Sequence, residues 1–209
     1  MNLRLNGLGK KFDREWIFRN LSLDLRAGQR LAVTGPNGSG KSTLLQVLSG
    51  VVPASEGTLT HFLADKPLAP DAVYRHVVLA APYLELIEEF TLDELLRFHV
   101  RFKPLRDGLP VDDFLELLEL NAARQKPLRY FSSGMKQRVK LGLALYSEAT
   151  LVLLDEPTAN LDGRGVSWYQ QHVQQLPADV LLLIASNQPE EYAFCPETLD
   201  ILDYKPIRF

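Results

Sequence analysis

The chain has 209 residues, and 46% of them are hydrophobic, which is enough for a real core and excludes a disordered chain. This length suits one large domain, or one domain that carries an inserted subdomain. Lys and Arg total 23 and Asp and Glu total 26, so the formal net charge of −3 argues against a nucleic-acid binder, which usually has a basic face.

The first part of the chain predicts strands, then a loop and a helix. Residues 1–33 alternate in strand fashion, and "RLAVTG" (30–35) predicts a buried strand that leads into a glycine-rich loop. The next stretch, "KSTLLQVLSG", has helical spacing and stops at Gly50.

The middle of the chain is helical in character. "TLDELLRFHVRF", capped by Thr91, and "DDFLELLEL" each place apolar residues on one helical stripe, and "SSGMKQRVKLGLALYSE" predicts a third helix that begins at a serine cap. Sequence of the β type bounds this block on both sides. We therefore expect one domain over 1–209, with residues 83–150 forming a helical subdomain inserted within it.

Strand and helix alternate again after this block. The sequence predicts a strand at 151–154, a helix from about 164 to 175, a strand at 180–185 and a short β-like tail, "LDILDY". Such alternation implies a mainly parallel sheet, whose ligands bind at the C-terminal ends of the strands.

"GPNGSGKS" (35–42) fits the phosphate-loop pattern G-x-x-x-x-G-K-[ST], with the required strand before it and helix after it. The glycines let the backbone curl so that successive N–H groups point at phosphate oxygens. Lys41 can reach the β- and γ-phosphates, and the Ser42 hydroxyl can bind Mg²⁺. An ordinary glycine-rich turn is the alternative, which this context disfavours. The residues predicted to bind the nucleotide here are Gly35, Asn37, Gly38, Ser39, Gly40, Lys41, Ser42 and Thr43.

Two carboxylates end the predicted strand "LVLLDEP". Asp155 suits the second-sphere Mg²⁺ carboxylate that phosphate-loop enzymes carry on a neighbouring strand. Glu156 could polarise a water for in-line attack on the γ-phosphate. A capped strand end is the alternative, and the upstream phosphate loop weighs against it. The expected cofactors are ATP and Mg²⁺.

"FSSGMKQR" (131–138) then identifies the class. Together with Walker A at 35–43, Walker B at 151–156 and "ANLD" at 159–162, its order and spacing resemble the ATP-binding cassette (ABC) ATPases. The family pattern L-S-G-G-Q is present as a variant that keeps Ser132 and Gly134.

This resemblance implies an α/β fold: a P-loop NTPase core with a mainly parallel sheet, an N-terminal antiparallel β part and an inserted helical subdomain. It also implies that two chains pair head to tail around two ATP molecules, with Ser132 and Gly134 contacting the γ-phosphate held by the other chain. Phe12 falls where the family stacks an aromatic on adenine, although a core phenylalanine competes with that role. Asp162 would be the acid of the D-loop, with a helix-capping aspartate as the alternative.

Two positions depart from the family pattern. The usual glutamine before the helical subdomain falls near Pro82 and Tyr83, and proline offers no side-chain ligand. The switch histidine that contacts the γ-phosphate is replaced by Asn187, which can donate a hydrogen bond but cannot become positive. The chain's histidines all lie elsewhere and are expected to be surface or core residues: His61, His76, His99 and His172.

The resemblance implies, as the favoured function, the ATP-hydrolysing subunit of an ABC transporter. By analogy with the family alone, a chain too short for an added regulatory domain favours export. Its partners would be a separate membrane-spanning subunit, docked around 80–100, and a second copy or another ABC ATPase, and no nucleic acid. A soluble mechanical or regulatory ABC ATPase is one alternative, and a monomeric phosphate-loop kinase or GTPase is another.

The chain is expected to be cytoplasmic and to lie at the inner face of the membrane through its partner. Its one cysteine, Cys195, allows no disulfide within the chain. "MNLRLNGLGKKF" lacks the apolar stretch of a signal peptide. The longest aliphatic run, Val180 to Ala185, is far shorter than the roughly 20 residues that span a bilayer.

Overall fold

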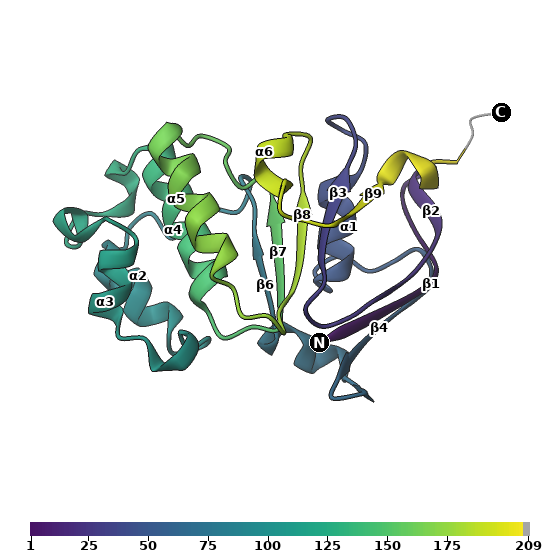
Figure 1. Cartoon of the computed structure of the whole chain (residues 1–209), viewed down its shortest axis with the longest axis horizontal. Coiled ribbons are helices and arrows are strands. Elements are labelled where there is room, and N and C mark those ends of the chain that lie inside the picture. The colour runs from purple at the N-terminus through teal and green to yellow at the C-terminus, as the bar shows by residue number, and fades with distance from the viewer. Residues whose placement is uncertain (207–209) are drawn as a thin grey trace. The chain divides into compact units, whose positions relative to one another are not determined.

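The computed structural model describes residues 1–206, which divide into two compact units (Figure 1). The first unit contains residues 1–79, 150–156 and the described chain from Pro177 onward. The second contains residues 80–149 and 157–176.

The first unit holds two β-sheets. An antiparallel sheet has the strand order β2-β1-β4-β5, and a second sheet has the order β6-β7-β8-β3-β9, in which β3 pairs in parallel with β8 and β9, and β7 with β8. The strands are β1 (Asn2–Phe12), β2 (Glu15–Leu25), β3 (Arg30–Thr34), β4 (Glu56–Leu63), β5 (Lys66–Pro67), β6 (Val77–Ala80), β7 (Leu151–Asp155), β8 (Leu181–Ala185) and β9 (Glu197–Asp200).

The strands β7 and β8 form the buried centre of the parallel sheet. Every residue of both strands is buried, as expected where a sheet is covered on both faces. The helix α1 (Lys41–Leu48) packs against both of them. Because β3, β7 and β8 run in the same direction, their C-terminal ends meet at one edge of the sheet.

The second unit is built from helices, which Figure 1 shows grouped together. They are α2 (Leu92–His99), α3 (Val111–Leu117), α4 (Ser133–Tyr146) and α5 (Gly163–Gln174). Thr91 starts α2 through a reciprocal capping box with Glu94, so its predicted cap is confirmed. At Gly142 of α4, a β-carbon would lie 2.2 Å from Leu118 Cδ2, so any larger residue there would require the Leu118 side chain to move.

Most of the predicted elements are present, but two details differ. Only the first two residues of the tail "LDILDY" belong to a strand, because β9 ends at Asp200. The Asp200 carboxylate accepts a hydrogen bond from the Leu202 N–H at 2.9 Å. This bond caps the 3-10 turn at Ile201–Tyr204. The helix α5, which lies outside the predicted subdomain 83–150, belongs to the second unit. A short helix, α6 (Pro189–Tyr192), follows β8.

Candidate functional site

The phosphate loop connects β3 to α1 at the C-terminal edge of the parallel sheet. Gly35, Gly38 and Gly40 have φ values of 137°, 75° and 114°, which side chains rarely tolerate. A β-carbon on Gly40 would also lie 2.4 Å from Ile17 Cγ2 on β2. Backbone conformation therefore favours glycine at all three positions, and close packing adds a second reason at Gly40.

Lys41 is the first residue of α1 and is only 4% exposed. Its ammonium donates to the carbonyl oxygens of Gly35, at 2.8 Å, and Pro36, at 3.2 Å. The lysine thus joins the end of the loop to the carbonyl groups at its beginning. Anionic phosphate oxygens are stronger acceptors than carbonyls, so the same ammonium is placed to bind a phosphate.

Asp155 ends β7 and is 1% exposed. Its Oδ1 atom has no hydrogen-bond partner among residues 1–206, while its carboxylate receives a hydrogen bond from Ser42. Burial raises the pKa of this carboxyl from 3.8 to about 6, although the Ser42 contact lowers it. A buried carboxylate with an unsatisfied oxygen beside a hydroxyl fits Mg²⁺, which prefers oxygen ligands.

Glu156 follows Asp155 and adopts a strained backbone conformation. Its φ is 42°, uncommon for a residue with a side chain, and its N–H donates to the Ala185 carbonyl at 2.9 Å. This bond fixes the turn at the end of β7 to the end of β8. Strain of this kind concentrates at functional sites, because the surroundings must maintain it.

Asn187 follows the end of β8 and reaches the phosphate loop. Its Nδ2 donates to Asn37 Oδ1 at 3.1 Å, across 150 residues of sequence. The sequence predicted a role for each of these residues but not their contact. A phosphate bound in the loop would offer the Asn187 amide a charged acceptor in place of the Asn37 amide.

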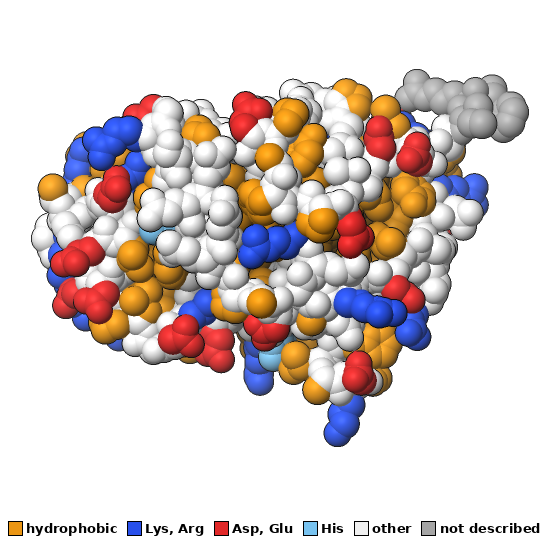
Figure 2. Space-filling view, in the orientation of Figure 1, with side chains coloured by type: hydrophobic (Ala, Val, Ile, Leu, Met, Phe, Trp, Pro, Cys, Tyr) orange, Lys and Arg blue, Asp and Glu red, His pale blue; other side chains and the backbone are white. Residues whose placement is uncertain are grey.

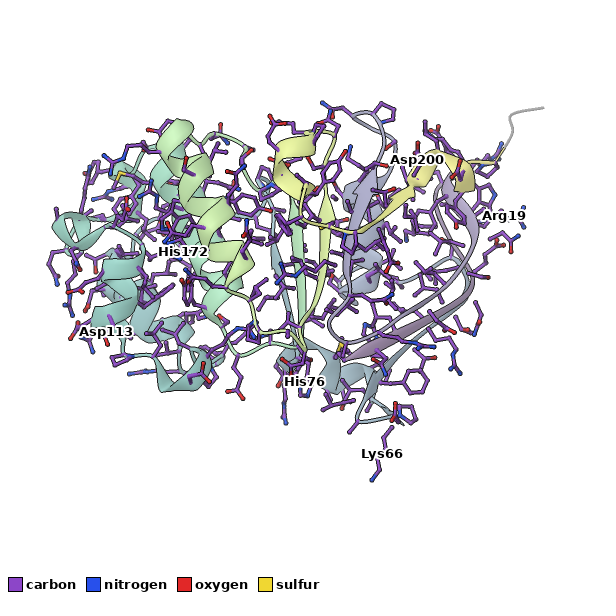
Figure 3. All side chains as sticks on the ribbon, viewed as in Figure 1. Arg19, Lys66, His76, Asp113, His172 and Asp200 are labelled. Carbon is purple, nitrogen blue, oxygen red and sulfur yellow. The ribbon has the colours of Figure 1, made fainter. Side chains whose placement is uncertain are left out.

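The four histidines have other surroundings. His61 bonds the Leu48 carbonyl at 2.8 Å, and His99 bonds Ser147 Oγ at 2.7 Å. His172, labelled in Figure 3, lies on α5 and contacts the Tyr146 hydroxyl. His76 accepts the Thr150 and Leu151 N–H groups through its main-chain carbonyl, each at 3.0 Å.

Phe12, at the end of β1, is 48% exposed, so the core-phenylalanine alternative is wrong. It lines a hollow of about 800 Å³ together with Trp16 and Ile17. Ile17 also packs against Gly40, so one residue of β2 contacts both the hollow and the phosphate loop. An aromatic ring is thus available beside the place where phosphates would bind.

In the second unit, Ser132 and Gly134 lie at the start of α4. Ser132 caps the helix, its Oγ accepting the Met135 N–H at 3.2 Å. A β-carbon on Gly134 would lie 2.9 Å from the Asn160 carbonyl oxygen, which explains the glycine. Both residues line a hollow of about 380 Å³ with Asp162, whose carboxylate caps α5 through the Gly165 N–H at 2.8 Å. The capping alternative for Asp162 is therefore present, and its D-loop role stays a prediction.

The segment after β6 has a contact that the sequence did not predict. Lys140 of α4 donates to the carbonyl oxygens of Ala81, at 3.2 Å, and Pro82, at 3.0 Å. The position expected near the family glutamine is thus held through its main chain by a lysine. Sequence reasoning missed it because these residues lie almost 60 positions apart.

The predicted site residues therefore form two sets. The first unit contains Phe12, the phosphate loop, Asp155, Glu156 and Asn187, and the second contains Ser132, Gly134 and Asp162.

Comparison with known proteins gives a consistent result. A family model described as "ABC transporter" matches residues 18–159. The chain is 33% identical over 196 residues to the cytochrome c biogenesis ATP-binding export protein CcmA of Brucella abortus, covering 90% of this chain and 86% of that one. It is 30% identical over 172 residues to the sulfate/thiosulfate import ATP-binding protein CysA 1 of Agrobacterium fabrum, covering 78% and 49%. The chain spans 46% to 66% of the length of several other curated relatives.

Among solved structures, the chain resembles the ATP-binding cassette MJ0796, solved as a dimer in a post-hydrolysis state bound to ADP and Pi. The TM-score is 0.80 at 21% identity, and the match covers 95% of this chain and 94% of that one. The predicted α/β fold with a P-loop NTPase core is thereby confirmed.

Proposed function

Because the chain belongs to the ABC transporter family, we propose that it binds ATP with Mg²⁺, hydrolyses it to ADP and phosphate, and so powers transport through a separate membrane-spanning chain. The observation that carries this proposal is the buried Asp155 carboxylate, with one unsatisfied oxygen, hydrogen-bonded to Ser42 of the phosphate loop. That pair supports a metal–nucleotide site rather than a glycine-rich turn.

The phosphate loop binds the substrate through its main-chain N–H groups and the positive end of α1. Lys41 exchanges its contacts with the Gly35 and Pro36 carbonyls for oxygens of the β- and γ-phosphates. Ser42 would hold Mg²⁺ directly and Asp155 would hold it from the second sphere, and the ion would supply positive charge that neutralises the phosphate oxygens.

Glu156 acts as the general base. It accepts a proton from the attacking water as the water oxygen bonds to the γ-phosphorus and the bond to the ADP oxygen breaks. Its strained backbone is hydrogen-bonded to the Ala185 carbonyl, and this fixes the position from which the Glu156 side chain extends. Asn187 donates a hydrogen bond to the γ-phosphate but takes no proton, so Glu156 is the only base in this scheme.

Two chains close head to tail around two ATP molecules. The start of α4, at Ser132 and Gly134, then offers its N-terminal N–H groups to the γ-phosphate on the other chain, and Asp162 contributes across the same interface. The hollow beside these residues supports this role. A helix N-terminus suits an anion because its first N–H groups and its dipole both favour negative charge.

The membrane partner docks on the segment 83–90 of the second unit. Tyr83, Leu84 and Ile87 are exposed there, and acidic side chains alternate with them, one of which, Glu88, pairs with Lys136 of α4. Among residues 1–206, no helix is both long and apolar enough to cross a bilayer. On the face shown in Figure 2, basic side chains are interspersed with acidic ones, which supports a protein partner over nucleic acid.

We favour export as the direction of transport and the cytoplasmic face of the membrane as the location. The chain covers 86% of the length of CcmA, which is named as an export protein. It covers only 49% of the length of CysA 1, which is named as an import protein.

The test of this function is Glu156→Gln in the purified chain. The variant keeps the shape and polarity of the side chain but removes the base, so we expect Mg·ATP binding to persist while turnover falls by roughly 100-fold or more. Both quantities are measured on the same preparation, by equilibrium binding and by phosphate release. Unchanged turnover would show that the base lies elsewhere.

A further inference from the structure

Phe12 does not stand alone beside the hollow, because a lysine covers one face of its ring. Residues 10 and 12 of β1 are two apart, so their side chains point to the same side of the strand. The Lys10 ammonium lies 4.7 Å from the centroid of the Phe12 ring. A cation at this distance is attracted to the negative face of an aromatic ring.

Lys10 is itself fixed. Its side chain is buried, at 8% exposure, although a lysine normally extends into water. Its Nζ donates at 2.9 Å to the carbonyl oxygen of Pro53, in the connector that follows α1. The ammonium is therefore held between the connector and the ring, while Phe12 as a residue is 48% exposed.

We propose that Lys10 is the positioning residue for the nucleotide base: it holds one face of Phe12 so that the other face is free for the base to stack. This inference rests on the proposed function, in which Phe12 stacks on adenine. A half-exposed ring at the end of a strand would otherwise have to be ordered when the base binds, and that ordering weakens affinity.

The neighbouring lysine provides a contrast. Lys11 points to the other side of the strand, and its ammonium lies 5.4 Å from the ring centroid of Trp16. Lys11 is exposed, and Trp16 is also covered by Arg19, whose guanidinium carbon lies 4.5 Å from the same centroid. Trp16 lines the same hollow as Phe12, but loss of Lys11 leaves Trp16 with the Arg19 cation and leaves the Lys10–Phe12 contact in place.

The experiment compares ATP with a triphosphate ligand that lacks the nucleoside. Binding of ATP and of inorganic tripolyphosphate, each with Mg²⁺, is measured for the full chain and for Lys10→Met. Because the inferred role concerns the base, we expect ATP affinity to fall about fivefold and tripolyphosphate affinity to change less than about twofold. Lys11→Met, the matched control, should leave both affinities unchanged.

A double variant separates positioning from a general structural effect. In a Phe12→Ala background, Lys10→Met should weaken ATP binding no further, because the ring through which it acts is gone. Equal losses for ATP and tripolyphosphate in Lys10→Met, or a loss that persists in the Phe12→Ala background, would overturn the inference.

The same measurements distinguish failure of the inference from failure of the stacking role. Normal ATP affinity in Phe12→Ala would refute stacking, and with it the role of Lys10. A loss in Phe12→Ala without one in Lys10→Met would refute Lys10 alone. If Lys10→Met does not fold, Lys10→Arg and Lys10→Gln make the same comparison: arginine keeps a cation over the ring and should retain ATP affinity, whereas glutamine should lose it.

Discussion

At the scale of single residues, the site depends on a carboxylate that the fold buries at a cost. Asp155 is 1% exposed, and burial raises its pKa from 3.8 to about 6. Between about pH 4 and pH 6, the folded chain therefore keeps a proton on Asp155 that the unfolded chain has released. Stability contributed by this group falls as pH rises from about 4 to about 6, and a bound metal ion would offset the loss.

Replacing Asp155 by Asn removes that charge. Without nucleotide or Mg²⁺, we expect the variant to be more stable than the parent at pH 7, by up to about 3 kcal/mol, and the difference to vanish near pH 4. Urea unfolding at the two pH values measures this. A stability difference that is the same at both pH values would contradict a buried, titrating Asp155.

Asn187 is the second residue-scale test. Its contact with Asn37 places the amide at the phosphate loop. If it donates to the γ-phosphate during hydrolysis, Asn187→Ala should lower kcat about tenfold while ATP affinity changes less than about threefold, because a hydrogen bond to a charged group is lost. Steady-state kinetics separate the two. An unaltered kcat would show that Asn187 has no part in hydrolysis and only follows the end of β8.

At the scale of elements, local sequence patterns predicted helices and their caps. Contacts between segments far apart in the sequence could not be predicted in this way. Helical periodicity and serine or threonine caps placed α2 and α4, because both signals lie within a few neighbouring residues. The Asn37–Asn187 and Lys140–Pro82 hydrogen bonds join segments far apart in sequence, so no local pattern reveals them. The Lys10–Phe12 contact could have been predicted from the sequence, because alternation along a strand places both side chains on one side of β1.

The start of α4 gives an element-scale prediction. Alanine at Gly134 would press a β-carbon to 2.9 Å from the Asn160 carbonyl, so the helix start must shift. We expect Gly134→Ala to weaken ATP-driven association in a Glu156→Gln background while ATP binding to the single chain is kept. Gly163→Ala is the control, because no atom lies within 4 Å of a β-carbon there. Association at parental strength in Gly134→Ala would argue against α4 as a contact to the other chain's nucleotide.

At the scale of the whole molecule, residues with predicted roles are found in both units. The first carries the residues that would bind and cleave Mg·ATP, and the second carries Ser132, Gly134 and the exposed segment 83–90. The sequence could propose which residues form the site, since the motifs are local, and those assignments stay predictions. It could not predict that 157–176 would join the helical unit, because that depends on packing between distant helices.

The most direct test of the account measures ATP binding and molecular mass together, by equilibrium titration and analytical ultracentrifugation with Mg²⁺. We predict that Glu156→Gln binds one ATP per chain and doubles in mass when ATP is added. We predict that the same chain carrying Lys41→Ala does neither, because the ammonium held at Gly35 and Pro36 is lost. ATP binding of parental strength after loss of Lys41 would contradict the phosphate-loop site on which the whole account rests.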